Sequence, residues 1–503
     1  MSEMITVTYD GREISTAIGQ TLSEITKGEM PCGGHGKCGK CKVIARGALS
    51  ALTDAERKQL SAEEIKGGVR LACLARAEGD CTVDPLRKKE ASQIVTDGTL
   101  PEFLLEPTFQ RYGVAIDIGT TTLAARLYDV RGRVLAQASG LNPQSTWGAD
   151  VISRIEAALS GNADRLAAAI CGALDRMLTE LAGIAGVRVE EIDGAVVTGN
   201  TVMLSLLTQQ PCEPFSHAPF MAERLFGETL TAGELSLSAL SPDTPVYLPA
   251  CISAFVGADT TCAILATELS AGGTAMLADI GTNGEMALWH NGKLTVSSTA
   301  AGPAFEGVGI SMGMRGATGA IDKVTVKDGA LRAHVIGDGA PVGICGSGLV
   351  DAAACMLDLE ILDESGFLED AEYAVKGPVT LTQKDIRMLQ LAKSAICAGL
   401  LTLLDSEKLK ASEIPIFYVA GGFGNYLNGT SAARIGLLPI SLAEKLSAVG
   451  NAALMGASML LLGAGLKEKT ERLSKTATVL DLSANPVFSD AYMTGMMLTE
   501  CEE

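Results

Sequence analysis

Two similar nine-residue segments, which share Asp-Ile-Gly-Thr, occur in this chain of 503 residues and constrain its fold more than any other feature. The copy at 114–122 reads VAIDIGTTT, and the copy at 276–284 reads MLADIGTNG. Each predicts a buried strand, a tight turn and a second strand, at 123–127 or 285–289. Glycine lets such a turn bring backbone N–H groups close to an anion, and the hydroxyls add further donors. One copy alone would be an ordinary strand and turn, but two predict an internal duplication that holds a polyphosphate between two halves.

Each copy also carries an aspartate at the end of its first strand, where a carboxylate can hold Mg²⁺ directly or through water. We therefore predict that Asp117 and Asp279 organise Mg²⁺ and the phosphates. The expected phosphate-binding residues are the glycine, hydroxyl and amide positions of the two turns: Gly119, Thr120, Thr121, Thr122, Gly281, Thr282, Asn283 and Gly284.

Other motifs follow these turns along the chain. Residues 419–425 read VAGGFGN, a buried strand that opens on Gly421 and Gly422, where a nucleoside can lie against the backbone. The paired turns resemble the two phosphate loops of the superfamily of acetate kinase, sugar kinases, Hsp70 and actin, and 419–425 resembles its adenosine motif. Residues 196–201 and 449–457 are similar to its two connecting segments. The resemblance implies a duplicated, actin-like ATPase fold that binds ATP.

Four of the thirteen cysteines form a spaced pattern. Cys32, Cys38 and Cys41 have the spacing C-x5-C-x2-C, and Cys73 follows 32 positions after Cys41. Three thiolates from one loop and one from afar can enclose a [2Fe–2S] cluster. Structural zinc is the alternative, but zinc ribbons generally show two close C-x2-C pairs, and here there is one. Cys81 is left over, and we assign it no role.

The net charge of −19 argues against a nucleic-acid or anionic membrane surface. Residues 1–11 are too polar for a signal peptide, and the apolar stretch 452–466 is too short to span a membrane. We therefore expect a cytoplasmic protein that contacts neither nucleic acid nor membrane. In that compartment, cysteines indicate metal or redox chemistry rather than disulfides.

A chain of this length is too long for one core, and we predict a multidomain protein of α/β and α+β class. The predicted segments are a β-grasp-like [2Fe–2S] ferredoxin domain (1–85), a linker (86–111), and the first (112–272) and second (273–503) halves of the ATPase.

Two stretches within the ATPase halves have unusual composition. Residues 208–250 contain six prolines and are interpreted as an insertion. The glycine-rich residues 300–319 are interpreted as too flexible for core structure, and as either a mobile segment over the cleft or a connector.

The C-x5-C-x2-C spacing resembles the adrenodoxin-like ferredoxins. A ferredoxin unit, a linker and an acetate-kinase-like ATPase, in this order, closely resemble the reductive activators of corrinoid proteins. In that family, ATP helps to reduce an inactive Co(II) corrinoid to the Co(I) form that a methyltransferase needs. The resemblance implies a corrinoid protein as partner and a low-potential ferredoxin or flavodoxin as electron donor. We also count a homodimer among the associations to be tested.

Energetics explain why an ATPase would accompany a ferredoxin unit. Plant-type [2Fe–2S] centres lie near about −400 mV, and Co(I) is a stronger reductant, so direct electron transfer is uphill. A conformational preference of about 5.5 kcal/mol corresponds to about 10⁴ in population, which is on the order of 240 mV for one electron. Closure of an ATP clamp is a source of that magnitude.

Other functions remain open at this point. One is a small-molecule kinase whose cluster senses redox state. Another is an activator of a radical dehydratase, although the known type bridges its cluster between subunits and lacks an N-terminal ferredoxin unit. A third is an electron-transfer scaffold that binds ATP without hydrolysing it.

Overall fold

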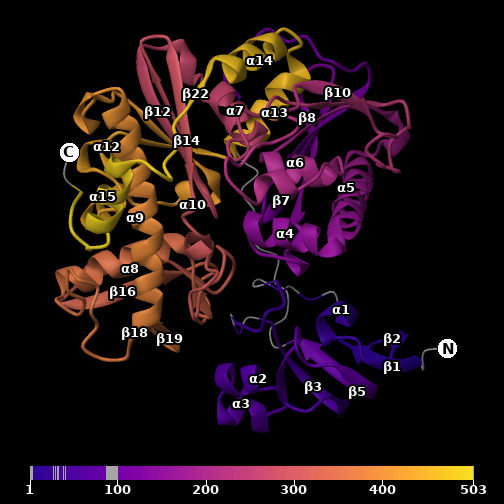
Figure 1. Cartoon of the computed structure of the whole chain (residues 1–503), viewed down its shortest axis with the longest axis vertical. Helices are drawn as coiled ribbons and strands as arrows, with labels where there is room; N and C mark the ends of the chain where they lie inside the picture. Colours follow the sequence, from indigo (N-terminus) through magenta and orange to yellow (C-terminus); the bar gives the residue numbers. More distant parts are fainter. Residues whose placement is uncertain are drawn as a thin grey trace. The chain divides into compact units, whose positions relative to one another are not determined.

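The structure is a computed structural model that describes residues 4–26, 28, 30, 33–37, 39, 41–85 and 100–501. It divides into two compact units, and each is described by itself (Figure 1). The first unit is Met1–Glu90 with Leu141–Ile170, and the second is Ala91–Gly140 with Cys171–Glu503.

The first unit contains a five-stranded mixed sheet in the order β2-β1-β5-β3-β4. Its first two strands form a hairpin around Asp10 and Gly11, which both adopt the positive φ that a tight hairpin turn requires. β5 lies parallel to β1 and antiparallel to β3, which also pairs with β4. The strands are β1 (Met4–Tyr9), β2 (Arg12–Ala17), β3 (Lys42–Leu49), β4 (Val69–Leu71) and β5 (Ala77–Pro85).

The first unit also contains several helices. Capping boxes at Thr53 and Ser61 begin two of them, because each side chain accepts a hydrogen bond from a free N–H of the first turn. The helices of the unit are α1 (Leu22–Thr26), α2 (Asp54–Gln59), α3 (Ala62–Lys66), α4 (Val151–Ala157) and the start of α5 (Ala163–Ala185).

The second unit is built on two six-stranded sheets, and these share one strand order. In both, a central strand has two hairpin-connected neighbours on one side and two later strands on the other: β8-β7-β6-β9-β11 in one sheet, β14-β13-β12-β20-β21 in the other. The hairpin partner is antiparallel to the central strand, and the first later strand is parallel to it. β10 and β22 complete the two sheets.

The strands of the first sheet are β6 (Tyr112–Ile118), β7 (Thr122–Asp129), β8 (Val134–Leu141), β9 (Ile192–Gly199), β10 (Glu228–Thr231) and β11 (Pro245–Leu248). Those of the second are β12 (Thr274–Ile280), β13 (Gly284–His290), β14 (Lys293–Thr299), β20 (Phe417–Ala420), β21 (Leu446–Gly450) and β22 (Thr478–Val479). The two strand–turn–strand units predicted around Asp117 and Asp279 are confirmed.

Helices α7 (Ala258–Ala266) and α13 (Ala452–Leu462) pack against each other, and α13 also covers β6 and β9. Their crossing is close because of Gly456, where a Cβ would lie 2.0 Å from the carbonyl oxygen of Cys262. All eleven residues of α13 are buried. A helix that is apolar on every side belongs in a core, and α13 is placed accordingly.

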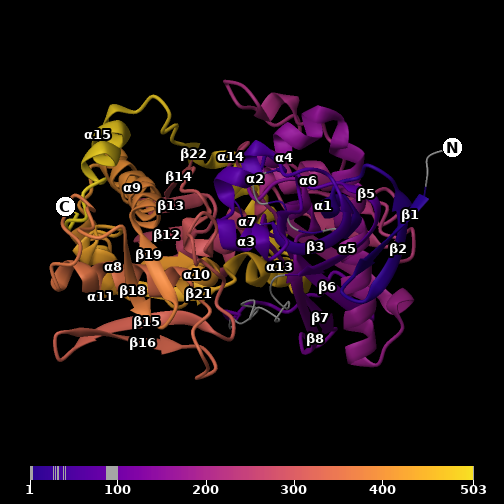
Figure 2. The same ribbon diagram turned by 90° about the horizontal axis from the view of Figure 1, so that it is seen from below.

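The long helix α9 (Gln383–Ser406) lies beside β13 and β14 of the second sheet, with α15 (Pro486–Thr494) next to it (Figure 2). The remaining helices are α6 (Thr201–Leu207), α8 (Gly346–Asp358), α10 (Gly421–Gly424), α11 (Gly429–Arg434), α12 (Ile440–Ala443) and α14 (Leu466–Thr476). Two small sheets contain β15 (Ala320–Lys327), β16 (Ala330–Val335) and β17 (Gly343–Ile344), and β18 (Glu372–Lys376) and β19 (Val379–Thr382).

One helix among the described residues, α9, is long and apolar enough to cross a membrane, and 78% of its most apolar window is buried inside the protein. This burial is typical of a core helix.

Two expectations differ from the structure. Residues 300–319 are not too flexible for core structure, because Ala304, Phe305 and Ile310 are buried in the core beside the second sheet. Their apolar side chains outweigh the conformational freedom of the surrounding glycines. Residues 208–250 are more than an insertion, since they contribute β10 and β11 to the first sheet.

The predicted linker falls partly outside the described residues, which exclude 86–99. Its end is anchored in the second unit, where the N–H groups of Glu106 and Thr108 donate to the carbonyls of Leu462 and Leu461.

Candidate functional site: a cavity between two Asp-Ile-Gly-Thr turns

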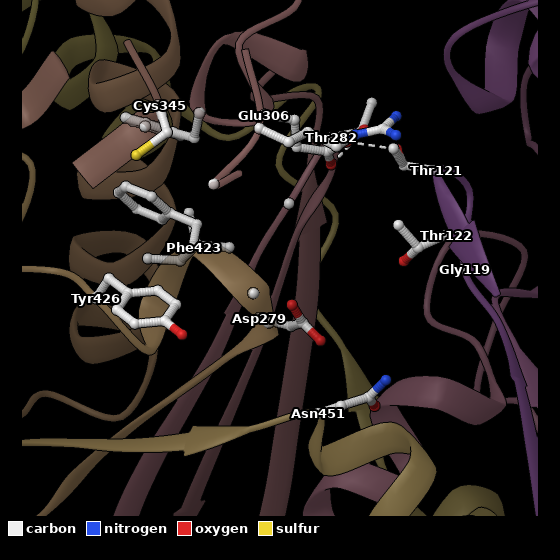
Figure 3. A pocket seen from close by; sticks show the side chains of 18 of the residues that line it. Gly119, Thr121, Thr122, Asp279, Thr282, Glu306, Cys345, Phe423, Tyr426 and Asn451 are labelled. Carbon is white, nitrogen blue, oxygen red and sulfur yellow. Dashed lines mark hydrogen bonds between the residues drawn. The ribbon is translucent and has the colours of Figure 1, made fainter. Parts of the chain in front are cut away.

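The two repeated turns line one cavity of about 440 Å³ in the second unit (Figure 3). Of the predicted nucleotide-site residues, eleven line it: Asp117, Gly119, Thr120, Thr121, Thr122, Asp279, Gly281, Thr282, Asn283, Gly421 and Gly422. Gly284 lies outside the lining, in β13, where a Cβ would lie 2.4 Å from Cδ1 of Ile396. Packing against α9 therefore accounts for this glycine.

Asp117 is the second-to-last residue of β6 and is buried, with 8% of its surface exposed. Asn451 donates from Nδ2 to its Oδ2 at 2.9 Å, and the Oδ1 of the same asparagine accepts from the N–H of Leu454 at the start of α13. Burial raises the pKa of Asp117 to about 7, the bond from Asn451 opposes this rise, and the nearby carboxyls of Asp259 and Asp279 add to it. Asn451 thus holds this carboxylate in place.

Asp117 belongs to a group of carboxyls. Asp279 faces Glu285 across the β12–β13 pair, and Asp259 lies in the first turn of α7. Burial raises the pKa of Asp259 to about 6 and that of Asp279 to about 7, where Asp259 and Glu306 add to the effect. Burial, Asp259 and Asp279 also raise the pKa of Glu285 well above its usual range. Close carboxyls repel one another, and a hard cation with oxygen ligands relieves that repulsion.

The first turn is shaped by Gly119, where a Cβ would lie 2.7 Å from the carbonyl oxygen of Thr122. Thr120 accepts a hydrogen bond at 2.9 Å from Nδ2 of Asn200, the residue that caps α6. Only glycine fits this approach of the two strands, and the turn leaves its hydroxyls along the cavity wall.

Glu306 joins the two turns. Its carboxylate accepts a hydrogen bond from the hydroxyl of Thr121 in the first turn and another, at 2.8 Å, from the hydroxyl of Thr282 in the second. These contacts are the dashed lines in Figure 3. The residue follows β14, in the segment that the sequence indicated to be flexible.

The adenosine-type glycines lie beside Asp279. Gly421 has φ +90°, and a Cβ there would lie 2.6 Å from Oδ1 of Asp279. Phe423 stacks on Phe305 with ring centroids 4.6 Å apart, and Tyr426 lies near Phe423 on the same side of the cavity (Figure 3). This side offers aromatic faces and open backbone, which suit a nucleoside.

The cavity is acidic. Six carboxyl side chains line it among the described residues, against the basic groups Arg315 and His334: Asp117, Asp259, Asp279, Glu285, Glu306 and Asp322. His334 is already engaged, with its Nδ1 2.6 Å from Asp322. A triphosphate would be repelled by so many carboxyls, so its binding requires a divalent cation.

A second candidate site lies in the first unit. Cys41 precedes β3 and Cys73 follows its neighbour β4, and the two Sγ atoms lie 3.2 Å apart. Cys32 and Cys38 lie outside the described residues, and among those described there is no group of three metal-ligating side chains. Cys81 is buried in the apolar core of the sheet, and this burial raises the pKa of its thiol.

The loop before Cys41 has the backbone that tight wrapping requires. Gly36 and Gly39 adopt positive φ, and at Gly36 a Cβ would lie 2.6 Å from Cδ1 of Leu74. A buried ion pair fixes the end of β4, close in sequence to Cys73. It joins Oε1 of Glu56 to Nε of Arg70 at 2.8 Å. Two thiols held together by a rigid sheet and a glycine-rich loop fit a cluster with cysteine ligands.

Comparison with known proteins identifies the family. Residues 112–272 match the family model described as the RACo middle region, and residues 273–503 match the C-terminal domain of RACo, the ASKHA domain. The corrinoid activation enzyme RamQ of Eubacterium limosum is 35% identical over 77% of this chain and 70% of its own length. The chain belongs to the family of corrinoid reductive activators.

Two further members of this activator family support the assignment. The [Co(II) methylated amine-specific corrinoid protein] reductase of Methanosarcina barkeri is 25% identical over 76% of each chain. The solved structure of a reductive activator for a corrinoid, iron-sulfur protein covers 99% of each chain, with 28% identity and a TM-score of 0.72. The actin-like ASKHA fold expected from the sequence is thereby confirmed.

Sequence reasoning about this activator did not identify four of the polar side chains around the cavity: Asn451, Asp259, Glu285 and Glu306. Asn451 and Asp259 each begin an apolar helix, and an isolated polar residue at such a position is a usable signal. Glu285 and Glu306 carried no local signal, because their role depends on strands and segments that meet only in the folded chain.

Proposed function

We propose that this protein uses ATP to help reduce Co(II) in a partner corrinoid protein to Co(I), the state that supports methyl transfer. Its relatives are named a corrinoid activation enzyme and a corrinoid protein reductase, and its residues 273–503 match the ASKHA domain model. The observation that carries the proposal is the acidic cavity. It is lined by two turns whose glycines and hydroxyls can bind phosphate, by a group of carboxyl side chains, and by a side with glycines and aromatic rings that suits a nucleoside.

We propose the following division of the chain. Residues 1–85 form a ferredoxin-like domain of β-grasp type, 86–111 form a linker, and 112–272 and 273–503 are the two halves of a duplicated ATPase. The five-stranded mixed sheet supports the first assignment, and the strand order shared by the two larger sheets supports the duplication.

In the nucleotide site, Asp117 and Asp279 would hold Mg²⁺, together with Asp259. Their oxygen donors and mutual repulsion fit a hard divalent cation. Gly421 and Gly422 would face the nucleoside. The phosphates would contact the two turns at Gly119, Thr120, Thr121, Thr122, Gly281, Thr282 and Asn283.

In the first unit, the [2Fe–2S] cluster would be held by Cys32, Cys38, Cys41 and Cys73, and the close pair of Cys41 and Cys73 supports this. When bound, such a cluster supplies a one-electron carrier. The electron donor would be a low-potential ferredoxin or flavodoxin in the cytoplasm.

The nucleotide would act as a bridge between the two sheets. Each sheet contributes one phosphate-binding turn, so a triphosphate that contacts both stabilises the arrangement in which they are close. A ligand shifts a conformational equilibrium by its difference in affinity for the two states. The arrangement favoured by ATP would be the one that engages the corrinoid partner and favours cobalt reduction.

The test uses the full-length protein, a Co(II) corrinoid protein and a low-potential reductant, with Co(I) absorbance as the readout. Co(I) should form with MgATP and should fall to background without nucleotide or with Asp117→Ala and Asp279→Ala combined. Asp370→Ala is the matched control, because Asp370 is exposed and lies outside the cavity. Co(I) formation that is equally complete without ATP would refute the proposal.

A further inference from the structure

Glu306 is placed with unusual rigidity for a residue in a glycine-rich segment. It is the last residue of the short 3-10 helix Pro303–Glu306. Ala304 and Phe305, which come before it in this helix, are almost completely buried. After it, Gly307 has φ +77°, and a Cβ there would lie 2.5 Å from the backbone nitrogen of Met314. The backbone is therefore fixed on both sides, and only the carboxylate arm is free to turn.

The carboxylate occupies the donors that a phosphate would use. Thr121 comes from the first turn and Thr282 from the second, and both hydroxyls donate a hydrogen bond to Glu306. Oε1 also lies 3.5 Å from the position that a Cβ on Gly281 would take, so the carboxylate rests over the open face of that glycine. Two hydroxyls and an accessible glycine around one anion form an anion site.

Other cavity carboxyls have different surroundings. Asp117 accepts from Asn451, and Asp259 accepts from the N–H of Thr260 at 2.7 Å. Asp279 and Glu285 face each other across a strand pair. Asp117, Asp259 and Asp279 belong to the proposed cation site and Glu285 lies beside it, whereas Glu306 contacts the hydroxyls of the phosphate turns.

We propose that Glu306 orients and deprotonates the water that attacks the terminal phosphate of ATP. The inference rests on the proposed function, of which it specifies the hydrolytic step. When the phosphate takes the two hydroxyls, the fixed backbone keeps the displaced carboxylate within a side-chain length of the phosphorus.

The reaction is ATP hydrolysis. The oxygen of the water forms a bond to the γ-phosphorus, and the bond from that phosphorus to the oxygen bridging to the β-phosphate breaks. Glu306 accepts a hydrogen bond from the water, takes one of its protons as the new bond forms, and returns that proton to the released phosphate. Positioned acid–base groups of this kind contribute about 10²–10⁴ in rate.

The test compares Glu306→Gln and Glu306→Asp with the wild-type full-length protein, without any corrinoid partner. MgATP affinity is measured by calorimetry, and kcat by phosphate release. Glu306→Gln should lower kcat by about 100-fold or more, with MgATP bound as tightly as in the wild type or more tightly, because an acidic cavity has lost one negative charge. Glu306→Asp should retain more kcat than Glu306→Gln, since it keeps the carboxylate.

The matched control is Glu444→Gln, which removes one charge from an exposed position outside the cavity and should behave as the wild type. A purely structural role would lower affinity and kcat together, and that result overturns the proposal. So does a Glu306→Gln protein with more than half of the wild-type kcat. Absence of hydrolysis by the wild type, alone and with the Co(II) corrinoid protein, overturns the inference about Glu306, whereas the ATP dependence of Co(I) formation tests the proposed function separately.

Discussion

Asn451 has two tasks that substitutions can separate. Its Oδ1 caps α13 through the N–H of Leu454, and its Nδ2 holds Oδ2 of Asp117 at 2.9 Å. Asn451→Ala removes both contacts. Asn451→Ser keeps a capping oxygen but is too short to reach Asp117. Asn451→Asp keeps the cap and places a second carboxylate against Asp117.

The structure sets the scale of each loss. Loss of an N-cap side chain costs about 1 kcal/mol of stability. Loss of a hydrogen bond to a charged group costs about 1.5–3 kcal/mol, or about 10- to 100-fold in an equilibrium constant. Two like charges about 4 Å apart repel by about 4 kcal/mol at an effective dielectric constant of about 20. Only the first of these terms concerns α13 itself, and the other two act on Asp117.

Calorimetric titration with MgATP and thermal unfolding together separate the two tasks. The serine and alanine variants should both bind MgATP about 10- to 100-fold more weakly, while only the alanine variant unfolds earlier through the lost cap. The aspartate variant should keep the stability of α13 and bind least well. Wild-type affinity in the serine and aspartate variants would show that Asn451 does not position Asp117 for the metal.

Three further predictions follow from individual residues. Cys41→Ser or Cys73→Ser should abolish the visible absorbance of a two-iron cluster, and Cys81→Ser should keep it; purification with zinc in place of iron would contradict this. Gly421→Ala should weaken MgATP binding at least about tenfold, because a left-handed backbone costs a non-glycine residue about 1–2 kcal/mol and the Cβ meets Asp279; unchanged affinity would contradict the assignment. Burial lowers the pKa of Lys393 to about 8, so its cost to folding is fully present below pH 8 and is relieved as the pH rises toward the unfolded value of about 10.4. In urea unfolding, the free energy of unfolding of the wild type should therefore rise by about 3 kcal/mol relative to that of Lys393→Met between pH 8 and 10.4. A difference that stays constant with pH would contradict this prediction.

The parts of the fold that could be predicted are those set by neighbours in sequence. The runs before Asp117 and Asp279 are apolar, each ends in glycine and polar residues, and each folds as a strand, a turn and a strand. The turn at Asp10 and Gly11 is likewise local, because both residues tolerate positive φ. The spacing of the N-terminal cysteines also predicted a contact, and Cys41 and Cys73 do lie side by side.

The parts that could not be predicted depend on residues far apart in the chain. The bond between Thr121 and Glu306 joins positions 185 apart, and that between Asn451 and Asp117 joins positions 334 apart. No local pattern encodes such a meeting. The many glycines around Glu306 led to the prediction of a flexible segment, because glycine allows the backbone more conformations. Composition does not show that Ala304 and Phe305 are buried, and their burial restricts this freedom.

The crossing of α13 and α7 has a consequence for how the protein can be divided. We propose a domain boundary at residue 272, yet α13 comes from the second half of the sequence and fills a groove of the first, with Gly456 seated on Cys262. The core around this crossing draws apolar side chains from both sheets. A polypeptide that stopped at residue 272 would leave that groove open as an apolar strip, and one that began at 273 would carry a wholly apolar helix without a surface to cover. We expect the fragment that ends at residue 272 and the fragment that begins at residue 273 each to aggregate when produced alone. Produced together, they would be soluble, because each covers the apolar surface of the other.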